Sequence, residues 1–196
     1  MKIKSAKFEL SALTFDTCPE SELPEFAFIG RSNVGKSSLI NLLCNEKALA
    51  RVSSTPGRTR EINFFTINDA WSLVDLPGYG YAKVSKSDRG RFNVFVSDYL
   101  VERPNLVCAF VLIDSRHPPQ KIDQEFIQWL IENKVPFALV FTKIDKVKAG
   151  VVKTNVELFR RAMAEWSDGS ADIFQTSIKT RDGYRDLLRF VGEAIS

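Results

Sequence analysis

The sequence predicts an α/β fold, with a mixed, mostly parallel sheet that carries helices on both faces. Two observations predict it. Short, continuous apolar runs are typical of strands that are covered on both sides. They alternate with segments whose apolar residues recur every three to four positions, as on the buried side of a helix. Such an alternating order favours parallel strands, and ligands then bind beyond the carboxyl ends of those strands.

Six strands are predicted from the apolar runs, at residues 26–30, 61–67, 71–75, 107–113, 137–141 and 172–175. Only Asn68-Asp69-Ala70 separates the second run from the third, so this pair is expected to form an antiparallel hairpin. The remaining strands are separated by helical segments, which predicts parallel connections between them.

Helices are predicted directly after residue 37 and at residues 88–101, 120–133, 151–166 and 183–195. In the third of these, Ile122, Phe126 and Leu130 illustrate the helical spacing of apolar side chains. Residues 26–196 are expected to form a single domain. Residues 1–25 are expected to be an N-terminal extension packed on it, in which the apolar residues between 8 and 13 form a short strand or a turn of helix.

The composition is that of an ordinary globular protein, with 44% hydrophobic and 26% charged residues in 196. A net charge of +3 permits contact with RNA without requiring it. Cys18, Cys44 and Cys108 are odd in number and far apart, which favours buried, reduced thiols over disulfides or metal ligands. No apolar run approaches the ~18 residues of a transmembrane helix. We therefore expect a cytoplasmic protein without membrane insertion.

A complete G-x-x-x-x-G-K-S motif occupies residues 30–37, between the first predicted strand and the first predicted helix. This context is typical of a loop that binds nucleotide phosphates. Gly30 and Gly35 allow the backbone to approach phosphate oxygens closely. Lys36 is expected to reach the β- and γ-phosphates, and the Ser37 hydroxyl is expected to bind Mg²⁺.

Two further segments are expected to complete the phosphate and Mg²⁺ site. Strand 71–75 ends in Asp75, which can hold Mg²⁺ through water, and the N–H of Gly78 can meet a γ-phosphate. The polar segment 53–60 is predicted to be a loop. From it, Thr59 is our choice for a hydroxyl ligand of Mg²⁺, with Thr55 as the alternative.

The ends of the last two strands are expected to recognise the base. Strand 137–141 leads to Thr142-Lys143-Ile144-Asp145, and the Asp145 carboxylate can accept hydrogen bonds from N1–H and the 2-amino group of guanine. Adenine lacks this donor pair, and comparable bidentate contacts discriminate by ~1–3 kcal/mol. The stem of Lys143 can lie against the base. Strand 172–175 leads to Thr176-Ser177-Ile178, whose N–H groups can bind the guanine carbonyl oxygen.

The order and spacing of these motifs resemble those of the translation-factor-like P-loop GTPases. The loop at residues 30–41 is similar to that of the Era/TrmE branch. The strings Thr-Pro-Gly-Arg-Thr and Asp-Leu-Pro-Gly-Tyr-Gly-Tyr-Ala-Lys resemble the EngB (YihA/YsxC) family of bacterial GTPases within that branch. The resemblance implies a Ras-like six-stranded domain, Mg²⁺ dependence, slow GTP hydrolysis, and a role in assembly of the large ribosomal subunit and in normal division and septation.

Other residues of the same motifs are expected to contact the nucleotide: Arg31, Ser32, Asn33, Val34, Ser38, Gly57, Arg58, Leu76, Pro77, Thr142, Ile144 and Ile178. For catalysis, the candidates are Lys36, Asn33, Thr59 and Gly78. Many GTPases place a Gln after the Gly78 position to orient the attacking water, but here the residue is Tyr79. In the related branch an Asn at the position of Asn33 helps to bind K⁺, which makes K⁺ a candidate activator. The alternative is that Asn33 only braces the loop.

Residues 79–91 combine aromatic and basic side chains, which suits rRNA and predicts the 50S subunit as a partner. A solvated turn followed by a core helix is the alternative, and a partner that is purely protein remains open. We expect a monomer that binds no DNA. The lone His117 is interpreted as a loop residue without a catalytic task, and Asp114 is expected to cap or position that loop. Competing functions are a P-loop kinase, a metabolic ATPase, or a division protein that acts only through protein contacts.

Overall fold

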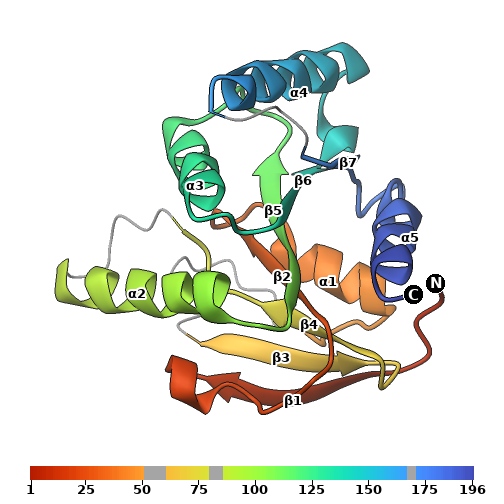
Figure 1. The fold of residues 1–196 in the computed structure, drawn as a ribbon. Coiled ribbons are helices and arrows are strands. Elements are labelled where there is room, and N and C mark those ends of the chain that lie inside the picture. The colour runs from red at the N-terminus through yellow and green to blue at the C-terminus, as the bar shows by residue number, and fades with distance from the viewer. Residues whose placement is uncertain (51–60, 80–85, 167–170) are drawn as a thin grey trace.

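The computed structural model describes residues 1–50, 61–79, 86–166 and 171–196 (Figure 1). Within them, one mixed sheet has the strand order β1-β3-β4-β2-β5-β6-β7. The strands are β1 (Ala6–Ala12), β2 (Glu25–Gly30), β3 (Ile62–Ile67), β4 (Trp71–Asp75), β5 (Leu106–Asp114), β6 (Phe137–Thr142) and β7 (Ile173–Gln175). β3 is antiparallel to β1 and β4, whereas β4, β2, β5, β6 and β7 run parallel. The predicted fold class and hairpin are confirmed.

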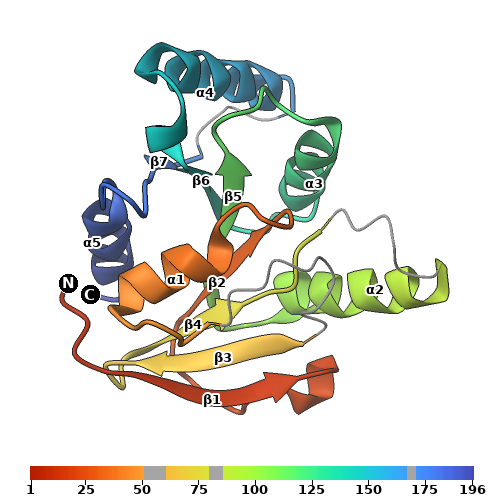
Figure 2. The same ribbon diagram turned by 180° about the vertical axis from the view of Figure 1, so that it is seen from behind.

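Helices cover both faces of the sheet (Figures 1 and 2). They are α1 (Lys36–Cys44), α2 (Lys86–Glu102), α3 (Lys121–Glu132), α4 (Ala149–Ala164) and α5 (Tyr184–Ala194), with short 3₁₀ turns η1 (Phe15–Thr17) and η2 (Ile144–Lys146). α1 and α5 pack on one face, and α2, α3 and α4 on the other. In the described part of the chain, no helix has the length and apolar character needed to cross a membrane.

The sheet has seven strands, so the prediction of six was wrong. β1 forms the additional edge strand by pairing with β3, and its register shifts between Phe8 and Leu10. Only Ala12 of this strand is buried, so the sequence lacks a strong pattern of alternating apolar residues. The strand is held instead by hydrogen bonds to residues that are distant in the sequence. The Asn68 side chain, in the β3–β4 turn, accepts hydrogen bonds of 2.6 and 3.1 Å from the backbone N–H groups of Lys4 and Ser5.

The central strands are buried on both sides, as their continuous apolar runs predict. All residues of β2 and β4 are buried. Burying a side chain such as Phe110 contributes ~1.5–3 kcal/mol. The three cysteines are also buried and free, which confirms the prediction of reduced thiols. Burial raises the pKa of the Cys44 and Cys108 thiols to about 12.

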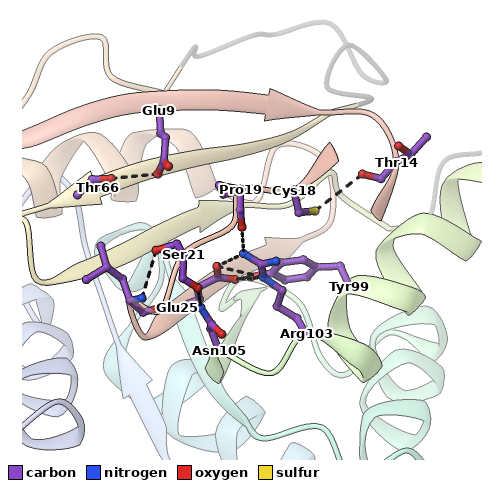
Figure 3. Close-up of polar contacts among 11 residues, drawn as sticks. Glu9, Thr14, Cys18, Pro19, Ser21, Glu25, Thr66, Tyr99, Arg103 and Asn105 are labelled. Carbon is purple, nitrogen blue, oxygen red and sulfur yellow. Dashed lines mark hydrogen bonds and ion pairs between the residues drawn. The ribbon is translucent and has the colours of Figure 1, made fainter. Parts of the chain in front are cut away.

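The amino-terminal ends of the central strands are closed by the segment between β1 and β2 (Figure 3). The carbonyl of Pro19 accepts a 2.7 Å hydrogen bond from the Arg103 guanidinium, which follows α2. The Asn105 amide donates to the carbonyls of Ser21 and Leu23. These contacts lie at the opposite end of the sheet from the motifs that the sequence analysis singled out, which follow the carboxyl ends of β2, β4, β6 and β7.

Candidate functional site

The loop at residues 30–37 joins β2 to α1, as predicted, and its backbone is shaped by its glycines. Gly35 has φ 103°, in the left-handed region that favours glycine, and it precedes the first residue of α1. Gly30 lies so close to β5 that a Cβ there would be 2.9 Å from the Leu112 carbonyl oxygen. The N–H groups at the start of α1 provide the positive potential that phosphate groups prefer.

Gly78 lies directly against this loop. A Cβ on Gly78 would be 2.5 Å from the Gly30 carbonyl oxygen and 3.6 Å from the Ser32 nitrogen. The structure therefore brings the segment that follows β4 close to the phosphate loop, which is compatible with the expected contact between the Gly78 N–H and a γ-phosphate. Only glycine fits there without a shift of the backbone.

Lys36 and Asp75 form an ion pair at the junction of the loop and the end of β4. The two side chains are only 12% and 6% exposed. Ser37 follows Lys36 at the start of α1, so a hydroxyl and a carboxylate belong to the same small region. Both are hard oxygen donors of the kind that Mg²⁺ prefers, and the residues present therefore fit the metal.

The loop is braced from the end of β6. The Thr142 hydroxyl donates a 2.6 Å hydrogen bond to the Val34 carbonyl, and the Lys143 ammonium donates one of 2.5 Å to the Asn33 carbonyl. Lys143 also pairs with Asp114 at 2.8 Å. Although burial alone would raise it, hydrogen bonds from Arg116 and Lys143 hold the pKa of the Asp114 carboxyl well below its usual range. Asp114 thus positions the Lys143 ammonium as well as its own loop.

Asp145 has one satisfied and one unsatisfied carboxylate oxygen. Its Oδ1 accepts a 2.6 Å hydrogen bond from the Ser177 hydroxyl, which holds the pKa of Asp145 below its usual value. Its Oδ2 is buried and has no hydrogen-bond partner among the described residues. The Lys146 ammonium lies 3.7 Å from this oxygen, which is an ion-pair distance without a hydrogen bond.

Ser177 is oriented for this contact by its neighbours. Its hydroxyl oxygen accepts N–H bonds of 3.1 Å from both Lys179 and Thr180, so its proton is directed to Asp145. Thr176 is anchored to β6 by a 2.7 Å bond from its N–H to the Phe141 carbonyl. The two loops predicted to recognise the base are therefore joined to each other.

The remaining predicted residues differ in exposure. Arg31, Ser32, Asn33 and Ile178 are exposed, whereas the side chains of Val34, Leu76 and Pro77 are buried, so these three can offer only backbone atoms to a ligand. Ser38 is half-buried, and Ile144 begins η2. Thr55, Gly57, Arg58 and Thr59 lie outside the described residues, as do Tyr81, Lys83 and the side chains of Lys86, Arg89 and Arg91.

A cavity of about 140 Å³ lies beside the phosphate loop, on the side of β5 and α3. It is lined in part by Arg31, Asn33, Asp114, His117 and Asp123. Sequence reasoning missed Asp123, which accepts a 2.8 Å hydrogen bond from the Tyr79 hydroxyl and lies 3.8 Å from the Arg31 guanidinium. One signal was available: Asp123 precedes Ile127 and Leu130 at helical spacing, so a carboxylate occupies the apolar stripe of α3.

Comparisons with known proteins agree with this geometry. A family model described as "50S ribosome-binding GTPase" matches residues 25–143. The chain is 52% identical over 191 residues to a probable GTP-binding protein EngB of Christiangramia forsetii, covering 97% of this chain and 96% of that protein. Its identity to the Flavobacterium psychrophilum protein of the same description is 52% over 195 residues, with 98% and 95% covered.

The fold is also similar to a solved structure. A crystal structure of a probable GTP-binding protein EngB superposes with a TM-score of 0.70 at 26% identity, covering 87% of this chain and 98% of that one. Both the sequence and the fold therefore match over most of the chain. The chain belongs to the EngB family of GTP-binding proteins.

Proposed function

We propose that the chain is a Mg²⁺-dependent GTPase with slow hydrolysis, which acts as a switch in assembly of the large (50S) ribosomal subunit and is needed for normal cell division and septation. One observation carries the nucleotide assignment. A phosphate loop and a carboxylate whose buried Oδ2 accepts no hydrogen bond from the described residues lie at the carboxyl ends of the strands, joined by the hydrogen bonds of Thr142 and Lys143.

Asp145 supports guanine as the base. Its Oδ1 is already bonded to Ser177, and its buried Oδ2 accepts no hydrogen bond from any residue that the structure describes. Leaving a buried charged acceptor without a hydrogen bond is costly, so a ligand that brings N–H donors to it is favoured. Guanine offers such donors at N1 and the 2-amino group, and adenine does not. The lowered pKa of Asp145 keeps this acceptor ionised at neutral pH.

Lys36, Ser37 and Asp75 support the phosphate and metal part of the site. Lys36 would bind the β- and γ-phosphates, and Ser37 and Asp75 would hold Mg²⁺, with Thr59 as a further expected ligand. When bound, Mg²⁺ neutralises the negative charge of the phosphate oxygens. The N–H of Gly78 would contact a γ-phosphate, because Gly78 lies against the loop.

Tyr79 supports slow hydrolysis. It occupies the place where many GTPases carry a water-orienting Gln. Its hydroxyl is bonded to Asp123, and its ring stacks on Phe126 at 4.3 Å between centroids. The side chain is thus engaged with α3, and no catalytic group replaces the amide at that position.

Asn33 is the candidate for activation by K⁺. It has φ 60°, a left-handed conformation that Asn tolerates better than most residues. Asn33→Ala therefore removes the amide and strains the backbone together, whereas Asn33→Gly removes the amide alone. GTP turnover should be measured for the wild type and both variants in K⁺ and in Na⁺. Faster turnover in K⁺, lost in Asn33→Gly, is the expected result. Equal rates in both salts for all three proteins would refute the role of K⁺.

The ribosomal role is supported by the description of the matching family model, "50S ribosome-binding GTPase". The test is co-sedimentation of the protein with ribosomal subunits in GDP, in a non-hydrolysable GTP analogue and without nucleotide. Selective, salt-sensitive binding to 50S subunits in the analogue is expected. Reversal of the charges at Lys83, Lys86 and Arg89 should weaken it. Binding that is independent of nucleotide, or absent, would contradict the switch.

A P-loop kinase or a metabolic ATPase is the competing enzyme class. Measured affinities for GDP and ATP distinguish a GTPase from this competing class. Strong preference for GDP is expected from the environment of Asp145, whereas tight ATP binding without a preference for GDP would overturn the assignment. A division protein that acts only through protein contacts would bind guanine nucleotides and not co-sediment with 50S subunits.

A further inference from the structure

Tyr79 is anchored to α3 by both ends of its side chain. Its hydroxyl donates a 2.8 Å hydrogen bond to Asp123 Oδ1. Its ring stacks on Phe126, with centroids 4.3 Å apart and ring planes 22° from parallel. Burial is the main reason that the pKa of the Tyr79 hydroxyl lies well above its usual value, and the neighbouring Asp123 raises it further. The hydroxyl is therefore a permanent donor to Asp123 near neutral pH.

Asp123 connects this anchor to the phosphate loop. Its side chain is 5% exposed, and its second oxygen lies 3.8 Å from the Arg31 guanidinium, within the loop. Burial raises the pKa of the Asp123 carboxyl, and the hydrogen bond from Tyr79 and the charge of Arg31 oppose this rise. A carboxylate at this buried position thus has two partners, Arg31 in the phosphate loop and Tyr79 directly after Gly78.

Gly78 connects the two partners of Asp123. It precedes Tyr79 in the chain, and its close approach to Gly30 and Ser32 leaves no room for a side chain. Because the next residue is attached to a helix, the Gly78 peptide has little freedom to leave the loop. The attachment of Tyr79 therefore limits where the Gly78 peptide can lie relative to the phosphate loop.

We propose that Asp123 is a positioning residue of the nucleotide site, which holds Tyr79 on α3, fixes Gly78 against the phosphate loop, and so favours a guanine nucleotide with three phosphates over one with two. The inference rests on the proposed function, in which the Gly78 N–H meets the third phosphate. Asp123 itself touches neither the base nor the phosphates in this account. It acts through Tyr79 on one side and through Arg31 on the other.

The test is a comparison of affinities for GDP and for a non-hydrolysable GTP analogue in the full chain with Mg²⁺. Tyr79→Phe retains the ring stacking and removes only the hydrogen bond. We expect it to weaken binding of the analogue by at least about tenfold, in line with loss of one hydrogen bond to a charged group, and to leave the GDP affinity within about twofold. The ratio of the two affinities is the readout, because a purely structural defect would lower both.

Variants of Asp123 test whether the same contact is responsible. Asp123→Ala should lower the ratio at least as much as Tyr79→Phe, because it also removes the contact with Arg31. The double variant should be no worse than Asp123→Ala, since the hydrogen bond of Tyr79 is already lost in that variant. Asp123→Asn retains an oxygen acceptor for the Tyr79 hydroxyl and should restore the wild-type ratio to within about twofold. Additive effects of the two single changes would contradict the proposal.

Tyr99→Phe is the matched control. Tyr99 also donates a buried hydrogen bond to a carboxylate, of 2.7 Å to Glu25, but at the opposite end of the sheet. This variant should lose stability without changing the affinity ratio. Equal weakening of GDP and analogue by Tyr79→Phe, no change in either, or the same shift in Tyr99→Phe would overturn the inference. Failure of the wild type to bind either nucleotide would instead refute the proposed function, and the inference with it.

Discussion

Arg103 and Glu25 form an ion pair in which the guanidinium contacts both carboxylate oxygens. Arg103 Nε lies 3.1 and 3.0 Å from the two oxygens, and Nη2 lies 2.6 Å from Oε1. Glu25 has no exposed side-chain surface, and Tyr99 donates a further hydrogen bond to it (Figure 3). The pair joins the start of β2 to the residue that follows α2.

Loss of Arg103 should destabilise the fold strongly. Arg103→Ala leaves the Glu25 carboxylate buried without its counter-charge, which typically costs about 3–5 kcal/mol. Urea unfolding of the variant and the wild type measures the difference. Lys121→Ala is the control, because the Lys121–Glu125 pair is 88% and 62% exposed and contributes about 0–1 kcal/mol. Similar losses in the free energy of unfolding for both variants would show that the buried ion pair contributes no more to stability than the exposed one.

Alanine at Gly78 should disturb the nucleotide site. The added Cβ would lie 2.5 Å from a backbone oxygen of Gly30, so the chain must move away from the loop. Overpacking of this kind costs about 1–3 kcal/mol, and we expect a comparable loss in affinity for a GTP analogue. In Gly150→Ala the new Cβ meets nothing within 4 Å, and α4 should gain up to about 0.5–1 kcal/mol. Unfolding and nucleotide titrations of both variants check these opposite signs.

Asp145→Asn should change the preferred base. The amide replaces one acceptor with a donor, which no longer matches the N1–H and 2-amino group of guanine. It matches xanthine, which has a carbonyl oxygen in place of the amino group. Affinity for GDP should fall by about 1–3 kcal/mol, and affinity for xanthosine diphosphate should rise. Asp182→Asn, on the β7–α5 loop that carries Ser177 but exposed and bonded to Thr180, should alter neither. An unchanged GDP affinity in Asp145→Asn would separate Asp145 from base recognition.

The stability contributed by Asp114 should depend on pH. Its pKa in the folded protein is lowered from the ordinary value, so the folded state binds fewer protons than the unfolded state. The contribution is fully present above the unfolded pKa of about 3.9 and is lost as pH falls below it, towards the folded pKa. Urea unfolding at pH 7, 5 and 3 should therefore show a difference between wild type and Asp114→Asn that shrinks at pH 3.

The control for this series is Asp186→Asn. Asp186 forms an exposed ion pair with Arg189 at 3.4 Å, and such pairs contribute about 0–1 kcal/mol. Its effect on the free energy of unfolding should stay small at every pH. A difference between wild type and Asp114→Asn that grows as the pH falls would have the wrong sign for a carboxylate held by Arg116 and Lys143.

The parts of the molecule that local patterns encode could be predicted from the sequence. The phosphate loop is contiguous, and its glycines, lysine and flanking elements are readable within about a dozen residues. The β3–β4 hairpin is predicted by its short turn, in which Asn68 and Asp69 adopt φ 52° and 53°. The free, buried state of Cys44 and Cys108 follows from the apolar segments around them.

Features that depend on distant partners were not predictable in the same way. β1 has a single buried residue, and its pairing with β3 depends on Asn68 contacts with Lys4 and Ser5 across more than 60 positions. The role of Asp123 depends on Tyr79, 44 positions earlier, whose hydroxyl is directed towards α3. A carboxylate in an apolar stripe signals a buried partner, but the sequence does not say which one.

The contacts of Thr142 and Lys143 with the phosphate loop also bear on the order in which parts of the site form while the protein is being synthesised. They join residues 108 and 110 positions apart, so the loop lacks this bracing until β6 has been made and has paired with β5. Contacts of such wide separation form late, because the intervening chain must first be ordered. A nascent chain that ends before residue 142 would carry the whole motif at residues 30–37 and still lack its bracing. We therefore expect a nascent chain to bind nucleotide tightly only after residue 143 has left the ribosome that makes it.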